Sequence, residues 1–348
     1  MGQWHRLVEP MGLLYGDAAV VAVRQGRALW LMGGTAAFSV VRLIEGAQIS
    51  DPLPVSDVPA DWQGVLARLV APVPDANLPA GAQVMGILNA TPDSFSDGGR
   101  HDTCETAVRA GRTMVEAGCR VLDIGGESTR PGSAVITPAQ EWERVGPVIT
   151  ALRQETPQAA LSVDTRNSLV MERALEAGVA VINDVTALQH DPQALPLLAG
   201  HHTCGIVLMH MRGTPQTMEQ HAVYEDVASE VVRELGERVE AAEAAGIARE
   251  RLMVDPGFGF AKTAAQNAEL LRRCLLLANL GCRVVFALSR KRMIGDMTGE
   301  ATPAARDAGT QAASLQAMPL GQPVLRVHDV PGMMQGVRVW QTLYAAKA

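Results

Sequence analysis

Eight short apolar runs alternate with longer amphipathic stretches from about residue 84 to the C-terminus, and this alternation constrains the fold more than any other feature. Each run ends in polar or glycine-rich residues. Eight strands that are each followed by a helix favour a closed parallel α/β structure, the (β/α)8 TIM barrel. The predicted strands are Val84–Asn89, Arg120–Ile124, Ala160–Asp164, Val179–Asp184, Gly205–His210, Arg251–Asp255, Arg283–Ser289 and Pro323–Val327.

The stretches between the runs have a helical spacing of apolar residues and glycine stops. Thr106–Ala117 repeats small and apolar residues at three- and four-residue steps and ends at Gly118. Glu172–Ala177 and Val231–Ala245 are also followed directly by glycine, a residue that commonly ends helices. The pattern therefore predicts repeated units of helix, glycine stop and strand.

Residues 1–80 have a different pattern. Proline-rich stretches at Asp51–Pro59 and Ala71–Pro79 flank a short helical patch, and glycine turns surround the apolar runs Ala28–Met32 and Ala37–Leu43. A small β or α+β subdomain fits this pattern. We predict an N-terminal extension of unknown role over residues 1–80 and a barrel over residues 81–348.

Composition excludes several classes of function. The net charge of −7 and the dispersed Lys and Arg residues give no basic surface for nucleic acid. No apolar run approaches the length of a membrane span, and no secretion signal begins the chain. The five cysteines are scattered and have no spacing that suits zinc. We therefore expect a cytoplasmic protein that binds neither nucleic acid nor membrane.

Polar side chains stand at the end of almost every predicted strand. In a barrel of this kind the C-terminal ends of the strands surround the active site, so these residues are candidates for one shared pocket. Each one alone could instead cap the following helix or have a structural role. Capping, however, does not require cations on the same rim as carboxylates. The strand ends carry Asn89, Asp123, Asp164, Asn183 with Asp184, His210, Asp255, Ser289 to Lys291, and Arg326 with His328.

The residue types of this rim suit a planar heterocycle that carries an anionic group. Asp164, Asn183 and Asp255 can exchange hydrogen bonds with the edge of a nitrogen-rich ring, and Lys291 can donate to its carbonyl. Arg326 and His328 lie two residues apart on one strand, so both can face one phosphate group. The two glycine-rich segments 91–99 and 125–132 are either loops that close over substrates or ordinary surface turns.

Seven ordered blocks resemble the dihydropteroate synthase family from about residue 84 to the C-terminus. The two most distinctive are Met85–Gly99, which contains TPDSFSDGG, and Leu122–Gly132, which contains GGESTRPG. The others are Ser162–Thr165, Ile182–Asp184, Asp255–Phe260, Ser289–Lys291 and Arg326–Asp329. Two departures are mild: Ala90 stands where valine is common, and Ala261 stands where glycine is common.

The resemblance implies a role for each matching residue. Lys291, Arg326, His328, Asp97 and Phe95 would be catalytic, and Asn89 would supply an oxygen to the cofactor Mg²⁺. The pterin would be held by Asp123, Asp164, Asn183, Met209, Asp255, Phe260, Lys291 and Arg326. The diphosphate and 4-aminobenzoate would be held by Thr129, Arg130, Ser289, Arg326 and His328. Small-molecule substrates and a homodimer also follow from the resemblance. The family is a target of sulfonamides, but the sequence alone does not give the sulfonamide sensitivity of this chain.

The implied reaction joins (7,8-dihydropterin-6-yl)methyl diphosphate to 4-aminobenzoate in folate synthesis. Departure of pyrophosphate can leave a cation that the ring nitrogens stabilise, and the aromatic amine is already neutral, so no general base is required. Backbone N–H groups around Ser289, at the start of a helix, could bind the carboxylate of 4-aminobenzoate. Lys291→Ala and Arg326→Ala are each expected to remove most activity and leave the fold intact.

Two alternatives remain open at this point. A pterin-binding methyltransferase domain shares the barrel and the pterin-holding carboxylates, but it transfers a methyl group to a corrinoid. A non-catalytic paralogue would keep the fold without the reaction. The Arg326 and His328 pair and both glycine-rich segments favour the synthase.

Overall fold

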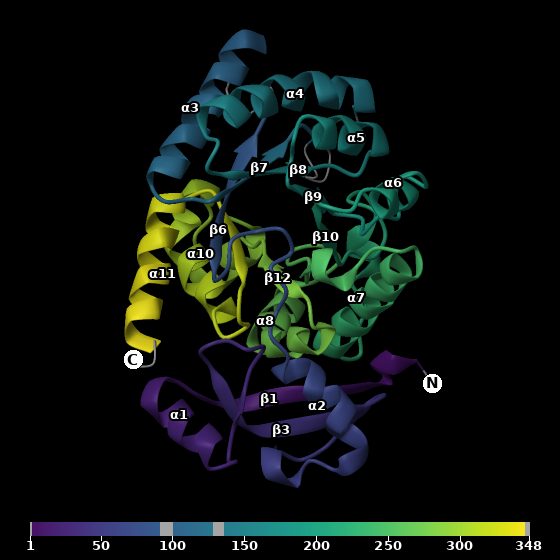
Figure 1. Ribbon diagram of the computed structural model, residues 1–348, viewed down its shortest axis with the longest axis vertical. Helices are drawn as coiled ribbons and strands as arrows, with labels where there is room; N and C mark the ends of the chain where they lie inside the picture. The colour runs from purple at the N-terminus through teal and green to yellow at the C-terminus, as the bar shows by residue number, and fades with distance from the viewer. Residues whose placement is uncertain (1, 91–99, 128–135, 345–348) are drawn as a thin grey trace.

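The computed structural model describes residues 2–90, 100–127 and 136–344. Its larger part is a closed barrel of eight parallel strands with helices around it (Figure 1), which confirms the predicted fold class. The strands are β6 (Gln83–Asn89), β7 (Val121–Gly125), β8 (Ala160–Asp164), β9 (Val181–Asp184), β10 (Gly205–Met209), β11 (Leu252–Asp255), β12 (Arg283–Phe286) and β13 (Val324–Val327).

The barrel strands agree with the eight predicted runs, with small differences at their ends. The largest difference is at β12, which ends at Phe286 and not at Ser289. The helices are α3 (Arg100–Glu116), α4 (Pro138–Glu155), α5 (Ser168–Glu176), α6 (Ala194–Gly200), α7 (Val227–Ala244), α8 (Ala264–Arg272), α9 (Arg292–Thr298), α10 (Asp307–Ser314) and α11 (Val330–Tyr344). The expected glycine stops follow α3, α5 and α7, and all three glycines have positive φ.

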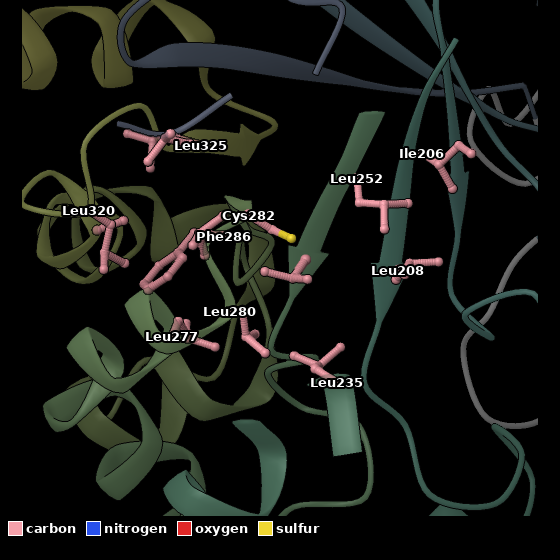
Figure 2. Close-up of a cluster of buried hydrophobic side chains, with 14 of the residues drawn as sticks. Ile206, Leu208, Leu235, Leu252, Leu277, Leu280, Cys282, Phe286, Leu320 and Leu325 are labelled. Atoms are coloured by element: carbon pink, nitrogen blue, oxygen red, sulfur yellow. The ribbon is translucent and has the colours of Figure 1, made fainter. Parts of the chain in front are cut away.

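The two faces of the strands bury different sets of side chains because successive residues of a strand point to opposite faces. Inside the barrel, one apolar layer fills the middle of the lumen. It contains Met85, Val121, Val181, Val207, Met253, Val285 and Val324. On the outside, residues such as Ile206, Leu208, Leu252 and Phe286 pack under the surrounding helices (Figure 2). The lumen is therefore a packed core and not a pore.

Residues 2–70 form a small sheet with two helices, which lies beneath the barrel in Figure 1. Its main pair is β1 (Arg6–Leu14) and β3 (Ala37–Glu45), which run antiparallel. The shorter strands are β2 (Leu29–Trp30), β4 (Gln48–Ile49) and β5 (Leu53–Pro54), and the helices are α1 (Gly16–Arg24) and α2 (Gln63–Val70). The apolar runs predicted in this region are strands, whereas β1 was not predicted.

This N-terminal sheet is docked on the barrel by specific polar contacts. The buried side chain of Asn279, in the 3-10 helix η7 (Cys274–Leu280), accepts from the Val8 N–H at 2.9 Å and donates to the Val8 carbonyl at 2.8 Å. Arg273 forms two hydrogen bonds to Glu9, at 2.7 and 3.2 Å. Trp4 packs so closely on α7 that a Cβ at Gly236 would lie 2.4 Å from its ring.

The proline-rich segment 71–82 closes the N-terminal end of the barrel and is not a free linker. Ala76 and Leu78 belong to the apolar layer of the lumen. The fully buried guanidinium of Arg283 donates to the carbonyls of Asp75, Pro79 and Gly81, and also to that of Gln322. One side chain therefore ties the segment to strand β12. Among the described helices, none is long and apolar enough to cross a membrane.

Candidate active site

A polar layer lies directly above the apolar layer of the lumen, at the C-terminal ends of the strands. It arises from strand alternation, because each polar residue follows an interior apolar residue by two positions. Thus Val121 is followed by Asp123, Val181 by Asn183, Met253 by Asp255 and Val324 by Arg326. The sequence therefore brings these side chains together at this end of the lumen, and they form the candidate pocket.

Arg326 is the centre of this pocket. Its Nε donates to Asp123 Oδ2 at 2.6 Å, and one terminal nitrogen donates to Asp164 Oδ2 at 2.8 Å. Asn183 Nδ2 also donates to Asp123 Oδ2, at 3.0 Å. One guanidinium thus joins residues of three strands, β7, β8 and β13.

Ser162 is a member of this network that sequence reasoning missed. Its hydroxyl donates to Asp123 Oδ1 at 2.5 Å, and the residue lies beside Asp123 in the register of β7 and β8. The signal was present in the sequence, since Ser162 is a polar residue inside an apolar run, two positions before Asp164. A fully buried carboxylate such as Asp123 requires such donors.

The electrostatics of the pocket follow from two carboxylates that share one guanidinium. Burial raises the pKa of Asp164 to about 7, and the negative charge of Asp123 acts in the same direction. Arg326 opposes both effects by favouring the ionised form. The pocket therefore offers acceptors, and near neutral pH an exchangeable proton, to a ring that presents several N–H groups.

Lys291 and Asp255 lie on the other side of the pocket. Lys291 Nζ donates to the carbonyl of Phe258 at 2.7 Å and lies 4.5 Å from the centre of the Phe260 ring. Burial lowers the pKa of Lys291 to about 8, although Asp255 favours its charged form. Burial also raises the pKa of Asp255, whose Oδ1 accepts from the Gly257 N–H at 2.7 Å.

An apolar wall completes this part of the site. Met209 and Phe260 belong to one buried cluster together with Val185, Met218 and Ala261. Met209 is the last residue of β10 and points into the lumen, as Val207 does. A flat ring could therefore lie against sulfur and aromatic surface while its edges meet polar groups.

The candidate anion-binding residues Ser289 and His328 also lie together. Ser289 Oγ and His328 Nδ1 are 2.9 Å apart, and the His328 N–H donates to the same hydroxyl at 3.2 Å. The helix that was predicted to start around Ser289 begins later, because α9 starts at Arg292. The N–H groups of Arg290 and Lys291 already donate to Thr310 Oγ1 and to the Leu288 carbonyl, which weakens the case for a backbone anion site there.

Three residues of the predicted rim face away from the pocket. Arg290 forms a bidentate pair with Asp307, with both distances 2.7 Å. Asp184 accepts from backbone N–H groups of its own loop, at Thr186 and Leu188. His210 binds Glu234 and Lys262 behind the pocket wall. For Asp184 the structural alternative therefore holds, because this residue follows Asn183 and points to the opposite face.

The remaining candidates divide between the rim and the segments that the structure does not describe. Asn89 ends β6 beside Gly125 of β7. Phe95, Asp97, Thr129 and Arg130 lie outside the described residues. Within the described part, no group of three or more His, Cys, Asp or Glu side chains could hold a metal ion.

A family model described as "Pterin binding enzyme" matches residues 85–328, which contain every described pocket residue named above. The chain belongs to this family. Among its relatives, the dihydropteroate synthase of Neisseria meningitidis serogroup C is 43% identical over 264 residues, covering 75% of this chain and 92% of that protein. The dihydropteroate synthase of Synechocystis sp. is 39% identical over 301 residues, covering 85% and 98%.

Solved structures of family members have the same architecture. The Xanthomonas albilineans dihydropteroate synthase with 4-aminobenzoic acid has a TM-score of 0.72 and 48% identity, covering 77% of this chain and 94% of that chain. The Yersinia pestis dihydropteroate synthase with a sulfonamide drug has a TM-score of 0.71 and 38% identity, covering 76% and 95%. About a quarter of this chain thus lies outside both structural matches.

Proposed function

We propose that the protein is a dihydropteroate synthase, which condenses (7,8-dihydropterin-6-yl)methyl diphosphate with 4-aminobenzoate to give 7,8-dihydropteroate and diphosphate. The observation that carries the proposal is the Arg326 guanidinium between Asp123 and Asp164, on the rim that also holds Asp255 and Lys291. The carboxylates that could accept from ring N–H groups are thus in direct contact with a cation that could bind phosphate.

The pterin would enter between the carboxylates and the apolar wall. Its N–H groups would bind Asp123, Asp164, Asn183 and Asp255, and Lys291 would donate to its carbonyl oxygen. Met209 and Phe260 would cover one face. Since ring donors can replace the guanidinium at Asp164, Arg326 would then be released to face the diphosphate and the pterin ring.

The leaving group would be stabilised by cations and donors at the same rim. As the methylene C–O bond breaks, its electron pair goes to the diphosphate, whose charge Arg326, His328 and Ser289 would stabilise. The carbon then accepts the lone pair of the 4-aminobenzoate nitrogen, which releases a proton. The carboxylates around the ring stabilise the positive charge that develops there. The cations of the rim thus stabilise the leaving group, and its carboxylates stabilise the pterin cation.

The proposed cofactor is Mg²⁺. Asn89, at the end of β6, would supply an amide oxygen to it, and a hard cation that keeps several waters and phosphate oxygens needs few protein ligands. Bound there, Mg²⁺ would neutralise charge on the diphosphate. Phe95, Asp97, Thr129 and Arg130 are proposed to complete the substrate sites and exclude water, with Thr129 and Arg130 beside the anionic groups.

The two alternatives receive less support. The relatives reported above are named as synthases and not as methyltransferases, and every described site residue keeps a side chain able to perform its role. The proposal extends to sulfonamide inhibition, to a homodimer and to a cytoplasmic location. The five cysteines, all within the described part, form no disulfide, which agrees with a reducing compartment.

The deciding experiment is pyrophosphate release by the purified full-length chain with both substrates and Mg²⁺. We expect stoichiometric dihydropteroate and pyrophosphate, with no product when either substrate or Mg²⁺ is omitted. Binding of the pterin diphosphate without turnover would favour the non-catalytic paralogue. Methyl transfer from a methylated pterin to a corrinoid would favour the methyltransferase.

A further inference from the structure

The turn between β11 and α8 is held by two lysine side chains, of which only one belongs to the site described above. Lys262 Nζ donates to the carbonyls of Gly257 and Phe260, and it contacts His210 Nδ1. All three distances are 3.0 Å. An ammonium group has three N–H donors, so Lys262 has one acceptor for each of them.

Several backbone carbonyls of this turn point toward the two lysines and need hydrogen-bond donors. Gly257, Gly259 and Ala261 all have positive φ, at 66°, 79° and 49°. The carbonyls of Gly257 and Phe260 face Lys262, whereas the carbonyl of Phe258 between them faces Lys291. The turn cannot move toward β10, since a Cβ at Gly257 would lie 1.9 Å from the His210 carbonyl oxygen.

The composition of the chain sets this pair of lysines apart. Lysine occurs three times in the whole sequence, at positions 262, 291 and 347, whereas arginine occurs 27 times. Two of the three lysines therefore bind one turn. A compact ammonium directs its three donors out of any one plane, whereas the five donors of a guanidinium lie in one plane. A lysine at position 262 suits the arrangement of its three partners.

We propose that Lys262 is a positioning residue for the pterin site, which fixes the Phe260 ring and the Phe258 carbonyl that holds Lys291. The proposal rests on the function proposed above, because the pocket that it shapes is the pterin pocket. Lys262 binds Phe260 through its carbonyl, and Phe260 lies against both Lys291 and Met209. Loss of the ammonium would let the pocket wall and the Lys291 anchor move together.

The charges around Lys262 make its ammonium sensitive to pH. Burial lowers the pKa of Lys262 to about 7, and the neighbouring cations Lys291 and Arg212 act in the same direction. Asp255 and Glu234 oppose them. His210 is neutral near pH 7, since burial lowers its pKa to about 4. Its Nδ1 can then accept from Lys262 while its Nε2 donates to Glu234, at 2.9 Å.

The first test separates binding of the two substrates. In Lys262→Met, which keeps chain length without charge, we expect the KM for the pterin diphosphate to rise roughly tenfold, the effect of losing one charged hydrogen bond. The KM for 4-aminobenzoate should change less than about twofold. The matched control is Thr263→Ala, which removes the N-terminal cap of α8 in the next residue and should lower stability with both KM values unchanged.

A KM for the pterin diphosphate that stays at the wild-type value in Lys262→Met would overturn the proposal. So would equal changes of both KM values that Thr263→Ala reproduces, because the effect would then come from general destabilisation. The pH profile adds a second criterion. Both Lys262 and Asp164 titrate near pH 7, so the pterin KM of the wild type should change there through both groups. Lys262→Met should lose the contribution of Lys262 and keep those of Asp164 and of Lys291 at higher pH.

The second test uses the unmodified chain and does not depend on turnover. With lysine labelled at 13Cε, the three lysine signals can be assigned with Lys262→Met and Lys291→Met and titrated by NMR. We expect the Lys262 midpoint to rise when the hydroxymethyl dihydropterin without its diphosphate saturates the site, because binding and protonation are reciprocally linked. An unchanged midpoint would sink the proposal. Pterin binding in a chain that releases no pyrophosphate would refute the proposed function alone.

Discussion

Arg326 binds two buried carboxylates, so its substitution affects more than the substrate. In Arg326→Ala, Asp123 and Asp164 would face each other without a cation, and breaking a buried pair in this way costs about 3–5 kcal/mol. We expect loss of nearly all activity together with a lower urea midpoint. The expectation from sequence that the fold stays unaffected is therefore revised for Arg326.

Lys291→Ala is the matched comparison for Arg326→Ala. Lys291 donates to a single carbonyl, that of Phe258, and its neutral form is accessible because its pKa is lowered to about 8. We expect a similar loss of activity with a much smaller change in the urea midpoint. Equal stabilities of the two variants would contradict the role of Arg326 as the counter-ion of the pocket.

Asp164 makes the stability of the protein depend on pH. Its pKa is about 7 in the folded chain and about 3.9 in an unfolded one. The folded state therefore binds more protons between these values, and its stability falls as the pH rises from about 4 to 7. In Asp164→Asn, the fall in the free energy of unfolding across this pH range should be smaller by at least about 1 kcal/mol. Urea unfolding at both ends of the window tests this, with the exposed Asp296→Asn as the control.

Ala261 has a backbone conformation that glycine adopts more easily. Its φ of 49° lies in the left-handed region, which costs a residue with a Cβ about 1–2 kcal/mol. Ala261→Gly would remove this strain, but the greater conformational freedom of glycine in the unfolded chain offsets part of the benefit. We therefore expect the substitution to stabilise the protein by about 0.5–1 kcal/mol. A thermal melt measures the effect. A lower melting temperature would show that the Ala261 methyl group, buried beside Phe260, contributes more than the strain.

At the scale of elements, the barrel was predictable, whereas strand β1 of the N-terminal sheet was not. A strand buried on both faces forms a continuous apolar run, and all eight runs were recognised for that reason. Strand β1 contains Glu9, Pro10 and Gly12, and its partner β3 follows a helix, so no local pattern indicates the pairing. Lys262 was also missed, because its contact with His210 joins residues that are 52 positions apart and no local pattern indicates it.

The segment 71–82 should behave as a structural part of the barrel, held by Arg283. In Arg283→Leu the four carbonyls that it binds would remain buried without a donor, at about 1–3 kcal/mol for each group left unsatisfied. We expect a loss of at least about 3 kcal/mol in urea unfolding. The control is Arg292→Leu, whose side chain is 87% exposed and should change stability by less than about 0.5 kcal/mol.

At the scale of the whole molecule, the N-terminal sheet and the barrel share buried surface and charged groups. Glu9, itself buried, has its charge balanced by Arg273, which also binds Asp226 at the start of α7. Arg233 of α7 donates to the carbonyls of Trp4 and Gly46. These contacts lie on helices around the barrel, and the segment 71–82 closes its N-terminal end, opposite the rim that is proposed to bind substrate. We therefore expect substitutions in the N-terminal sheet to change the stability of the protein and not to act directly on the reaction.

Two truncations separate the sheet from the closing segment. A chain that begins at residue 71 loses Val8, the partner of Asn279, and Glu9, one partner of Arg273. It keeps the contacts of Arg283, so we expect a lower melting temperature with residual pyrophosphate release. A chain that begins at residue 83 also leaves the guanidinium of Arg283 and the lumen layer uncovered, and buried groups without partners are costly. This shorter chain should not accumulate in soluble form. If it instead melted within about 2 °C of the full-length protein, the N-terminal sheet and the segment 71–82 would be dispensable for the barrel.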